Sequence, residues 1–189
     1  MKNLKSSLVL LMAFAGFGLA RAQEEAAPAA PPTGTKLIVD LRTELPGLFS
    51  YGTWEGKLTI TKSGYAVHGK GAQGNGGMGR EISPSLDFNE VEFVEVALGT
   101  VVGNEVPYVT IAFNDADGTQ YAARVLVDQL VPGQPVWLRV RRQDFRLNST
   151  EPGDDSRMNW SQVTRWHLQG DWTTQKPMHA IFVALRMRR

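Results

Sequence analysis

Aromatic and basic residues alternate with aliphatic ones in the run 136–142 (VWLRVRR). Successive side chains of an extended strand point to opposite faces, so Trp137, Arg139 and Arg141 share one face, and the aliphatic residues between them face the core. An aromatic ring offers flat apolar area, and a guanidinium group offers a planar fork of donors that fits hydroxyl and carboxylate oxygens. These residue types suit the binding of a ligand, and none of them is by itself a catalytic group.

The same alternation places further polar and aromatic side chains on the outer faces of three other runs, 106–114, 121–127 and 162–169. If all these outer faces belong to one sheet, they form a single surface. Its members are Tyr108, Thr110, Arg124, Trp137, Arg139, Arg141, Arg165 and His167. A blander interpretation stays open, in which a loop covers Trp137 and the arginines are only solvated.

The opposite faces of these runs supply the expected core. Its members include Val109, Ile111, Phe113, Trp166 and Leu168. Trp172 lies in the connection 170–177, between two strand-like runs, and is expected to be exposed. We therefore add Trp172 to the candidate ligand contacts.

Signatures of catalysis are missing from the sequence. No two of the three histidines have the spacing of a metal-binding helix motif, there is no Cys, and no Gly-x-Ser-x-Gly occurs. Glu90, Glu92 and Glu95 form the densest acidic set, which charges at a sheet edge explain as well. The sequence predicts a protein that is not an enzyme and that needs no cofactor.

Two glycine-rich stretches resemble ligand loops but lack the context that these loops require. Residues 69–74 (GKGAQG) fit G-x-G-x-x-G, but Asn75, two further glycines and then Pro84 follow where a phosphate-binding helix should begin. Residues 114–118 (NDADG) resemble a calcium loop without its later Glu or its flanking helices. Both stretches are predicted to be loops, the second a hairpin turn.

Residues 1–22 have the features of a secretory signal peptide, namely early lysines, the short apolar core 8–15 and a small-x-small ending, Ala20-Arg21-Ala22. The sequence therefore predicts a secreted or periplasmic protein with no transmembrane segment after cleavage. Cleavage removes three of the 20 basic residues and leaves 17 against 19 acidic ones, a net charge of −2. A nearly neutral chain gives no global reason to bind nucleic acid.

Residues 23–35 (QEEAAPAAPPTGT) are predicted to be a disordered leader, and residues 36–189 one domain. Short runs with period-two alternation recur between Gly- and Pro-containing turns, and no convincing helix occurs. The pattern predicts about nine strands, including a hairpin of 57–61 and 65–69 around Ser63-Gly64. The expected fold is an all-β, two-sheet sandwich of the jelly-roll kind.

The chain resembles the galactose-binding-like jelly rolls, which include carbohydrate-binding modules and CIA30-type domains. The resemblance covers roughly residues 36–189 and is carried by a late pattern of a Trp-containing strand, a Phe, a loop and two further strands. The matching residues are Trp137 with Leu138 and Val140, Asp144-Phe145, Val163 to Gly170, and Ile181 to Met187.

This resemblance implies a non-catalytic domain that binds polysaccharide on a sheet face or at loop tips, and it allows a structural calcium ion. The arginines of the candidate surface favour an acidic glycan. Two alternatives remain open from the sequence. The first is a structural or protein-interaction domain of the cell envelope without a sugar ligand, and the second is a glycoside hydrolase.

Overall fold

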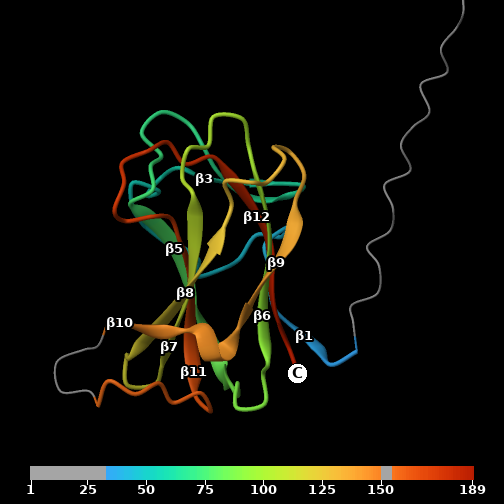
Figure 1. Ribbon diagram of the computed structural model, residues 1–189, viewed down its shortest axis with the longest axis vertical. Coiled ribbons are helices and arrows are strands. Elements are labelled where there is room, and N and C mark those ends of the chain that lie inside the picture. The colour runs from blue at the N-terminus through green and yellow to red at the C-terminus, as the bar shows by residue number, and fades with distance from the viewer. Residues whose placement is uncertain (1–32, 150–154) are drawn as a thin grey trace, which may run out of the picture. The chain divides into compact units, whose positions relative to one another are not determined.

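The computed structural model describes residues 33–149 and 155–189 (Figure 1). The predicted signal peptide and nearly all of the predicted leader lie outside the described residues. Pro32–Arg189 form one compact unit. No helix in the described part of the chain is long and apolar enough to cross a membrane.

Six antiparallel strands form the first sheet, called sheet A here. Its members are β1 (Thr35–Asp40), β3 (Leu58–Thr61), β4 (Gly64–Val67), β6 (Phe93–Thr100), β9 (Val136–Arg141) and β12 (Ala180–Arg188). The strand order is β3-β4-β12-β6-β9, and β1 pairs with β12. The predicted hairpin is confirmed as β3 and β4, with Thr61 opposite Gly64.

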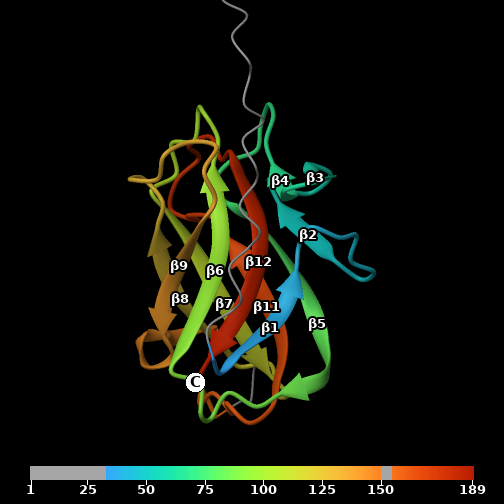
Figure 2. The same ribbon diagram turned by 90° about the vertical axis from the view of Figure 1, so that its right-hand side faces the viewer.

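Six further antiparallel strands form sheet B. Its members are β2 (Phe49–Gly52), β5 (Gly76–Leu86), β7 (Tyr108–Asp115), β8 (Gln120–Leu126), β10 (Arg146–Ser149) and β11 (Val163–Gln169). The order is β10-β8-β7-β11-β5-β2. One 3-10 turn, η1 (Arg142–Asp144), leads from β9 in sheet A to β10 in sheet B. Figure 2 shows the two sheets face to face, which confirms the predicted all-β sandwich.

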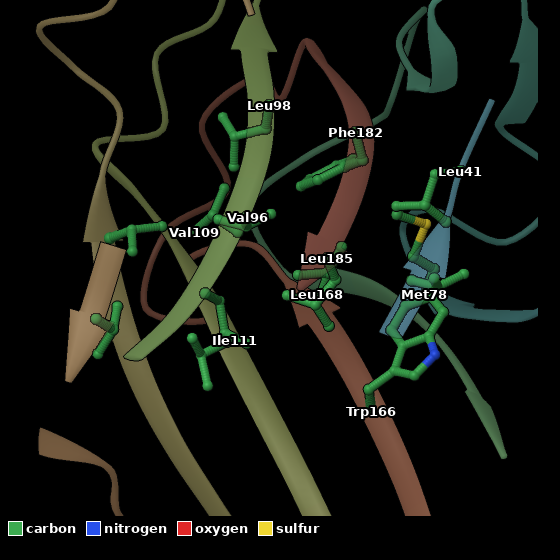
Figure 3. Packing of buried hydrophobic residues seen from close by; sticks show 14 of the residues in the cluster. Leu41, Met78, Val96, Leu98, Val109, Ile111, Trp166, Leu168, Phe182 and Leu185 are labelled. Carbon is green, nitrogen blue, oxygen red and sulfur yellow. The ribbon is translucent and has the colours of Figure 1, made fainter. Parts of the chain in front are cut away.

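Every second side chain of the central strands enters the space between the sheets. Figure 3 shows Val96, Leu98, Phe182 and Leu185 of sheet A against Val109, Ile111, Trp166 and Leu168 of sheet B, and all of them are at most 1% exposed. The predicted core faces of β7 and β11 are therefore confirmed, and so is that of β9 at Leu138 and Val140, while Val136 at its start is 39% exposed. Full burial stabilises the fold by about 1.5–3 kcal/mol for each large apolar side chain.

Three strands were not predicted, namely β2, β5 and β10. The segment 45–53 contains Pro46, Gly47 and Gly52, which are typical of a loop. The start of β5 is rich in glycine, and all four residues of β10 are exposed. Period-two alternation is invisible where one face of a strand consists of glycine or where neither face is apolar. All three missed strands belong to sheet B.

Candidate functional site

Residues that pair directly across antiparallel strands point to the same side, so the outer face of sheet B can be read as rows that cross the strands. One row consists of Phe49, Gly79, His167, Ala112, Ala122 and Arg146. The adjacent row consists of Tyr51, Gly77, Gln169, Thr110 and Arg124. The small residues of β5, β7 and β8 in these rows, namely Gly77, Gly79, Thr110, Ala112 and Ala122, leave space above the sheet between the larger side chains.

A groove of about 600 Å³ lies over the part of this face that β7, β8, β10 and the end of β11 form. Strands β7, β8, β10 and β11 form its floor and walls, and the connection 170–173 closes one side. The lining residues include Tyr108, Thr110, Ala122, Arg124, Asp144, Arg146, Asn148, Gln169, Trp172 and Thr173. We call this cavity the sheet-B groove.

An aromatic pair, of which Trp172 is exposed and Tyr51 half-buried, lies at the β2 side of the sheet-B groove. Trp172 is 52% exposed and stacks on Tyr51, with ring centroids 6.2 Å apart and planes inclined by 20°. Gln169 Nε2 donates a hydrogen bond to the Tyr51 hydroxyl over 2.9 Å, and His167 Nδ1 lies 3.1 Å from the same oxygen. These contacts fix the Tyr51 ring and so hold the indole that rests on it.

A second cluster shapes the polar part of the groove. The Tyr108 hydroxyl donates to Asp171 Oδ1 over 2.6 Å, and the Arg124 guanidinium lies 4.4 Å from the centre of the Tyr108 ring. Burial, and then the Asp171 carboxylate, raise the pKa of Tyr108, so the hydroxyl keeps its proton at neutral pH. Arg124 is thus held by an aromatic face, and no carboxylate in residues 33–149 and 155–189 forms an ion pair with it.

His167 supports this site from below and does not line the groove. Its side chain lies edge-on to Phe49 and Tyr51, and the residue is only 7% exposed. Burial, reinforced by the charge of Arg165, lowers the pKa of His167 to about 4. The imidazole is therefore neutral at pH 7, where it packs beneath the aromatic rings.

The structure divides the predicted single surface into two. Tyr108, Thr110, Arg124 and Trp172 come together at the sheet-B groove. His167 and Arg165 share that face, the latter in an ion pair with Glu81 outside the groove.

Trp137, Arg139 and Arg141 belong to β9 in sheet A, so the prediction that all these residues share one surface is wrong. Alternation along a strand assigns a residue to one face of that strand and carries no information about which sheet the strand joins.

Sequence reasoning missed several residues that shape the site. They are Phe49, Tyr51, Asp144, Arg146, Asn148, Gln169 and Asp171. Most lie on or next to the unpredicted strands β2 and β10. The aromatic alternation of Phe49 and Tyr51 was a usable signal, because period two is the mark of a strand even between glycines.

The structural calcium that the resemblance allows finds no matching ligand set in residues 33–149 and 155–189, where no three His, Cys, Asp or Glu side chains gather. The turn between β7 and β8 brings only Asp115 and Asp117 together. Burial, and then the contact with Asp117, raise the pKa of Asp115. Calcium takes six to eight oxygen ligands, usually with several carboxylates, so this pair does not fit the ion.

Gly77 leaves room for the Tyr51 ring, and Gly77→Ala is expected to displace it. An added Cβ would lie 2.5 Å from the Tyr51 Cζ and hydroxyl oxygen, so the ring must shift from the position in which it stacks on Trp172. Overpacking of this kind costs about 1–3 kcal/mol in the free energy of unfolding, which urea titration measures. In a Tyr51→Ala background the cost of Gly77→Ala should largely vanish, and an unchanged cost there would contradict the clash.

No protein family and no curated protein matches this sequence. Solved structures do share its fold. The family 11 carbohydrate-binding module of the cellulosomal cellulase Lic26A-Cel5E of Clostridium thermocellum superposes with a TM-score of 0.54 at 16% identity, over 82% of this chain and 94% of that one. The xylan-binding module CBM15 gives a TM-score of 0.52 at 10% identity, over 82% and 95% of the two chains.

The agarase AgWH50C gives a TM-score of 0.59 at 11% identity, and 82% of this chain covers 24% of that enzyme. The match thus reaches only a part of the agarase. Together with the two antiparallel sheets, these likenesses confirm the expected jelly-roll sandwich. This chain therefore has the β-sandwich fold of the carbohydrate-binding modules.

Proposed function

We propose that this chain is a non-catalytic module that binds a polysaccharide in the sheet-B groove. The observation that carries the proposal is the exposed Trp172 ring, stacked on Tyr51 at one end of a groove that crosses the strands. An indole face covers the apolar C–H face of a sugar ring, and the groups of the groove beyond it offer hydrogen bonds to hydroxyls.

The dimensions of the face favour a polymer over a single sugar. The row from Tyr51 to Arg124 crosses five strands, β2, β5, β11, β7 and β8. Four interstrand steps of 4.8 Å make this row roughly 19 Å long. The sheet-B groove occupies the part of this row over β11, β7 and β8 and continues over β10, and Trp172 and Arg124 both line it, so a segment of a few sugar units fits.

The charge of the groove favours a neutral glycan. Arg124 and Arg146 line it together with Asp144, and Asp171 lies behind Tyr108, so cations and anions balance. Two of the fold relatives point to neutral backbones by their names, since one is a xylan-binding module and another was solved with a β-1,3-1,4-mixed-linked tetrasaccharide. An acidic glycan in this groove, which the sequence favoured, is the other outcome that the test below distinguishes.

Two exposed tryptophans on opposite sheets provide a matched test. The mature protein, Trp172→Ala and Trp137→Ala are compared by isothermal titration with mixed-linked β-1,3-1,4-glucan, xylan, agarose oligosaccharides and polygalacturonate. Trp172→Ala is expected to weaken binding of the neutral ligand by about tenfold or more, since loss of a buried aromatic contact costs about 1.4 kcal/mol or more. Trp137→Ala should bind that ligand as the parent does.

Equal affinity of the parent and Trp172→Ala for every glycan that binds would overturn the groove as the site. Absence of binding to every polymer would favour the alternative of a structural or protein-interaction domain. Release of reducing sugar ends from any of these polymers would contradict a non-catalytic role.

We also propose that the protein acts outside the cytoplasm, in the periplasm or the medium, on the strength of the signal sequence in residues 1–22. Expression of the full chain with its own N-terminus should give a mature protein that begins at Gln23. Mass spectrometry of the periplasmic and medium fractions measures this, and a full-length product confined to the cytoplasm would contradict the proposal.

A further inference from the structure

The outer face of sheet A carries a second ordered array of side chains, on the opposite side of the sandwich from the sheet-B groove. One row across the strands consists of Thr35, Arg188, Phe93 and Arg141. The next row consists of Leu37, Arg186, Glu95 and Arg139. Trp137 follows on β9, beside Ala97 of β6. We call these residues the sheet-A face.

A single buried carboxylate organises the second row. Glu95 is 1% exposed and accepts hydrogen bonds from Arg139 Nε over 2.8 Å and from Arg186 Nε over 2.6 Å, one on each carboxylate oxygen. Burial alone would raise the pKa of Glu95, but these two bonds outweigh it and hold the pKa below its ordinary value. The carboxylate is therefore charged, and both of its oxygens are used to fix guanidinium groups.

Aromatic rings fix the same guanidinium groups from a second direction. Arg186 lies 3.6 Å from the centre of the Trp137 ring. Phe93 lies between Arg139 and Arg188, at 4.8 and 5.1 Å from its ring centre. Cations that are held in place before a ligand arrives lose little conformational entropy on binding.

The charge of these two rows is one-sided. Four arginines face one carboxylate, in a chain that is otherwise nearly neutral. The nearest other carboxylates are Asp40 in the row of Trp137, which pairs with Arg42, and Glu90 and Glu92 beside Arg141 at the end of the sheet. Within residues 33–149 and 155–189, no carboxylate forms an ion pair with Arg141 or Arg188. Exposed apolar groups flank the cations, since Trp137 is 43% exposed on β9 and Leu37 is 52% exposed on β1.

We propose that the sheet-A face is a second binding site, for a carboxylated polysaccharide, and that it works independently of the sheet-B groove. Guanidinium forks bind carboxylates with two parallel hydrogen bonds, and the flanking Trp137 and Leu37 give apolar contact to the sugar rings between the charges. Such apolar contact favours a polyuronate over a ligand that offers only charge. The site does not rest on the function proposed for the groove.

The experiment compares polygalacturonate with its fully methyl-esterified form, which keeps the backbone and loses the carboxylates. Affinity electrophoresis in gels that contain each polymer measures binding of the mature protein. Arg141→Gln/Arg188→Gln and Trp137→Ala test the sheet-A face, and Trp172→Ala tests the groove. Lys62→Gln/Arg157→Gln is the charge-matched control, because both residues are exposed and lie outside the two sites.

The parent should bind polygalacturonate and lose this binding on methyl esterification. Arg141→Gln/Arg188→Gln should weaken it by about tenfold or more, since two guanidinium groups lose their charge-assisted hydrogen bonds to the carboxylates. Trp137→Ala should weaken it as well. Trp172→Ala and the charge-matched control should bind polygalacturonate like the parent. Loss of Trp172 should therefore weaken binding only of neutral polymers, and loss of Trp137 only of acidic ones.

Three results would overturn the second site. One is equal weakening by the charge-matched control, which would reduce the effect to net charge. Another is loss of polygalacturonate binding in Trp172→Ala, which would place the acidic polymer in the groove. The third is tighter binding to single-stranded DNA or to vesicles of anionic phospholipid than to polygalacturonate. This result would show that the ligand of the sheet-A face is not a carboxylated polysaccharide. If Trp172→Ala does not affect binding of neutral glycans, the function proposed for the sheet-B groove fails, and the second site on the sheet-A face is unaffected.

Discussion

Glu95→Gln is expected to lower the free energy of unfolding by about 3 kcal/mol, because removal of one partner from a buried ion pair leaves the other charge uncompensated. The Arg186 side chain is only 13% exposed. Among the carboxylates of the described residues, Glu95 alone forms an ion pair with it. A glutamine in place of Glu95 keeps one acceptor oxygen but turns an N–H₂ group toward one of the two guanidinium groups. Urea titration at pH 7 measures the change.

Glu81→Gln provides the matched control for this prediction. Glu81 also pairs with an arginine, Arg165, across neighbouring strands, but both side chains are exposed, 58% and 41%. An exposed ion pair is worth about 0–1 kcal/mol, so this substitution should cost less than about 1 kcal/mol. Equal costs for the two substitutions would show that burial of Glu95 does not determine its effect.

Acid is expected to destabilise the domain through His167, by about 3 kcal/mol between pH 6.5 and pH 4. Burial lowers the pKa of His167 from 6.5 to about 4 in the folded chain. In this range the unfolded chain binds a proton that the folded chain does not, so the free energy of unfolding falls as the pH falls and levels off below the folded pKa. A pKa shift of one unit corresponds to about 1.36 kcal/mol.

His167→Phe should remove this part of the pH dependence. The Nε2 of His167 is buried without a hydrogen-bond partner, so a phenyl ring costs no bond at that atom, while the contact of Nδ1 with Tyr51 is lost. Urea titrations at pH 4, 5.5 and 7 of the parent, His167→Phe and His68→Phe measure the effect, with the exposed His68 as control. The same slope in the parent and in His167→Phe would contradict the assignment.

The strands whose two faces differ in polarity were predictable from the sequence. In β7, β8 and β11 one face is apolar and the other is not, and the assignment of Tyr108, Arg124 and His167 to outer faces agrees with the structure. The core residues Ile111 and Trp166 were found in the same way. Burial of one face of a strand leaves a periodic trace, and that trace is what period-two reasoning detects.

The composition of the site was less predictable, for two physical reasons. The rim depends on Tyr51 and Arg146, which belong to the edge strands β2 and β10, and each of these strands is only four residues long, so any alternation in it is short. The grouping of outer faces depends on strand pairing over long sequence distances, as when β9 joins β6 in sheet A while β8 joins β7 in sheet B. Local alternation does not determine such pairing.

The position of β12 has a consequence for the order of events during synthesis. This strand, the last in the chain, pairs with β6 on one side and with both β1 and β4 on the other. The middle strand of sheet A is therefore synthesised last. Thr35 of β1 can pair with Arg188 only after nearly the whole domain has been synthesised. Contacts between distant parts of a sequence form slowly, because the loop between them must close first. Sheet A is thus expected to close only after β12 has been synthesised, while sheet B, which lacks β12, does not depend on it.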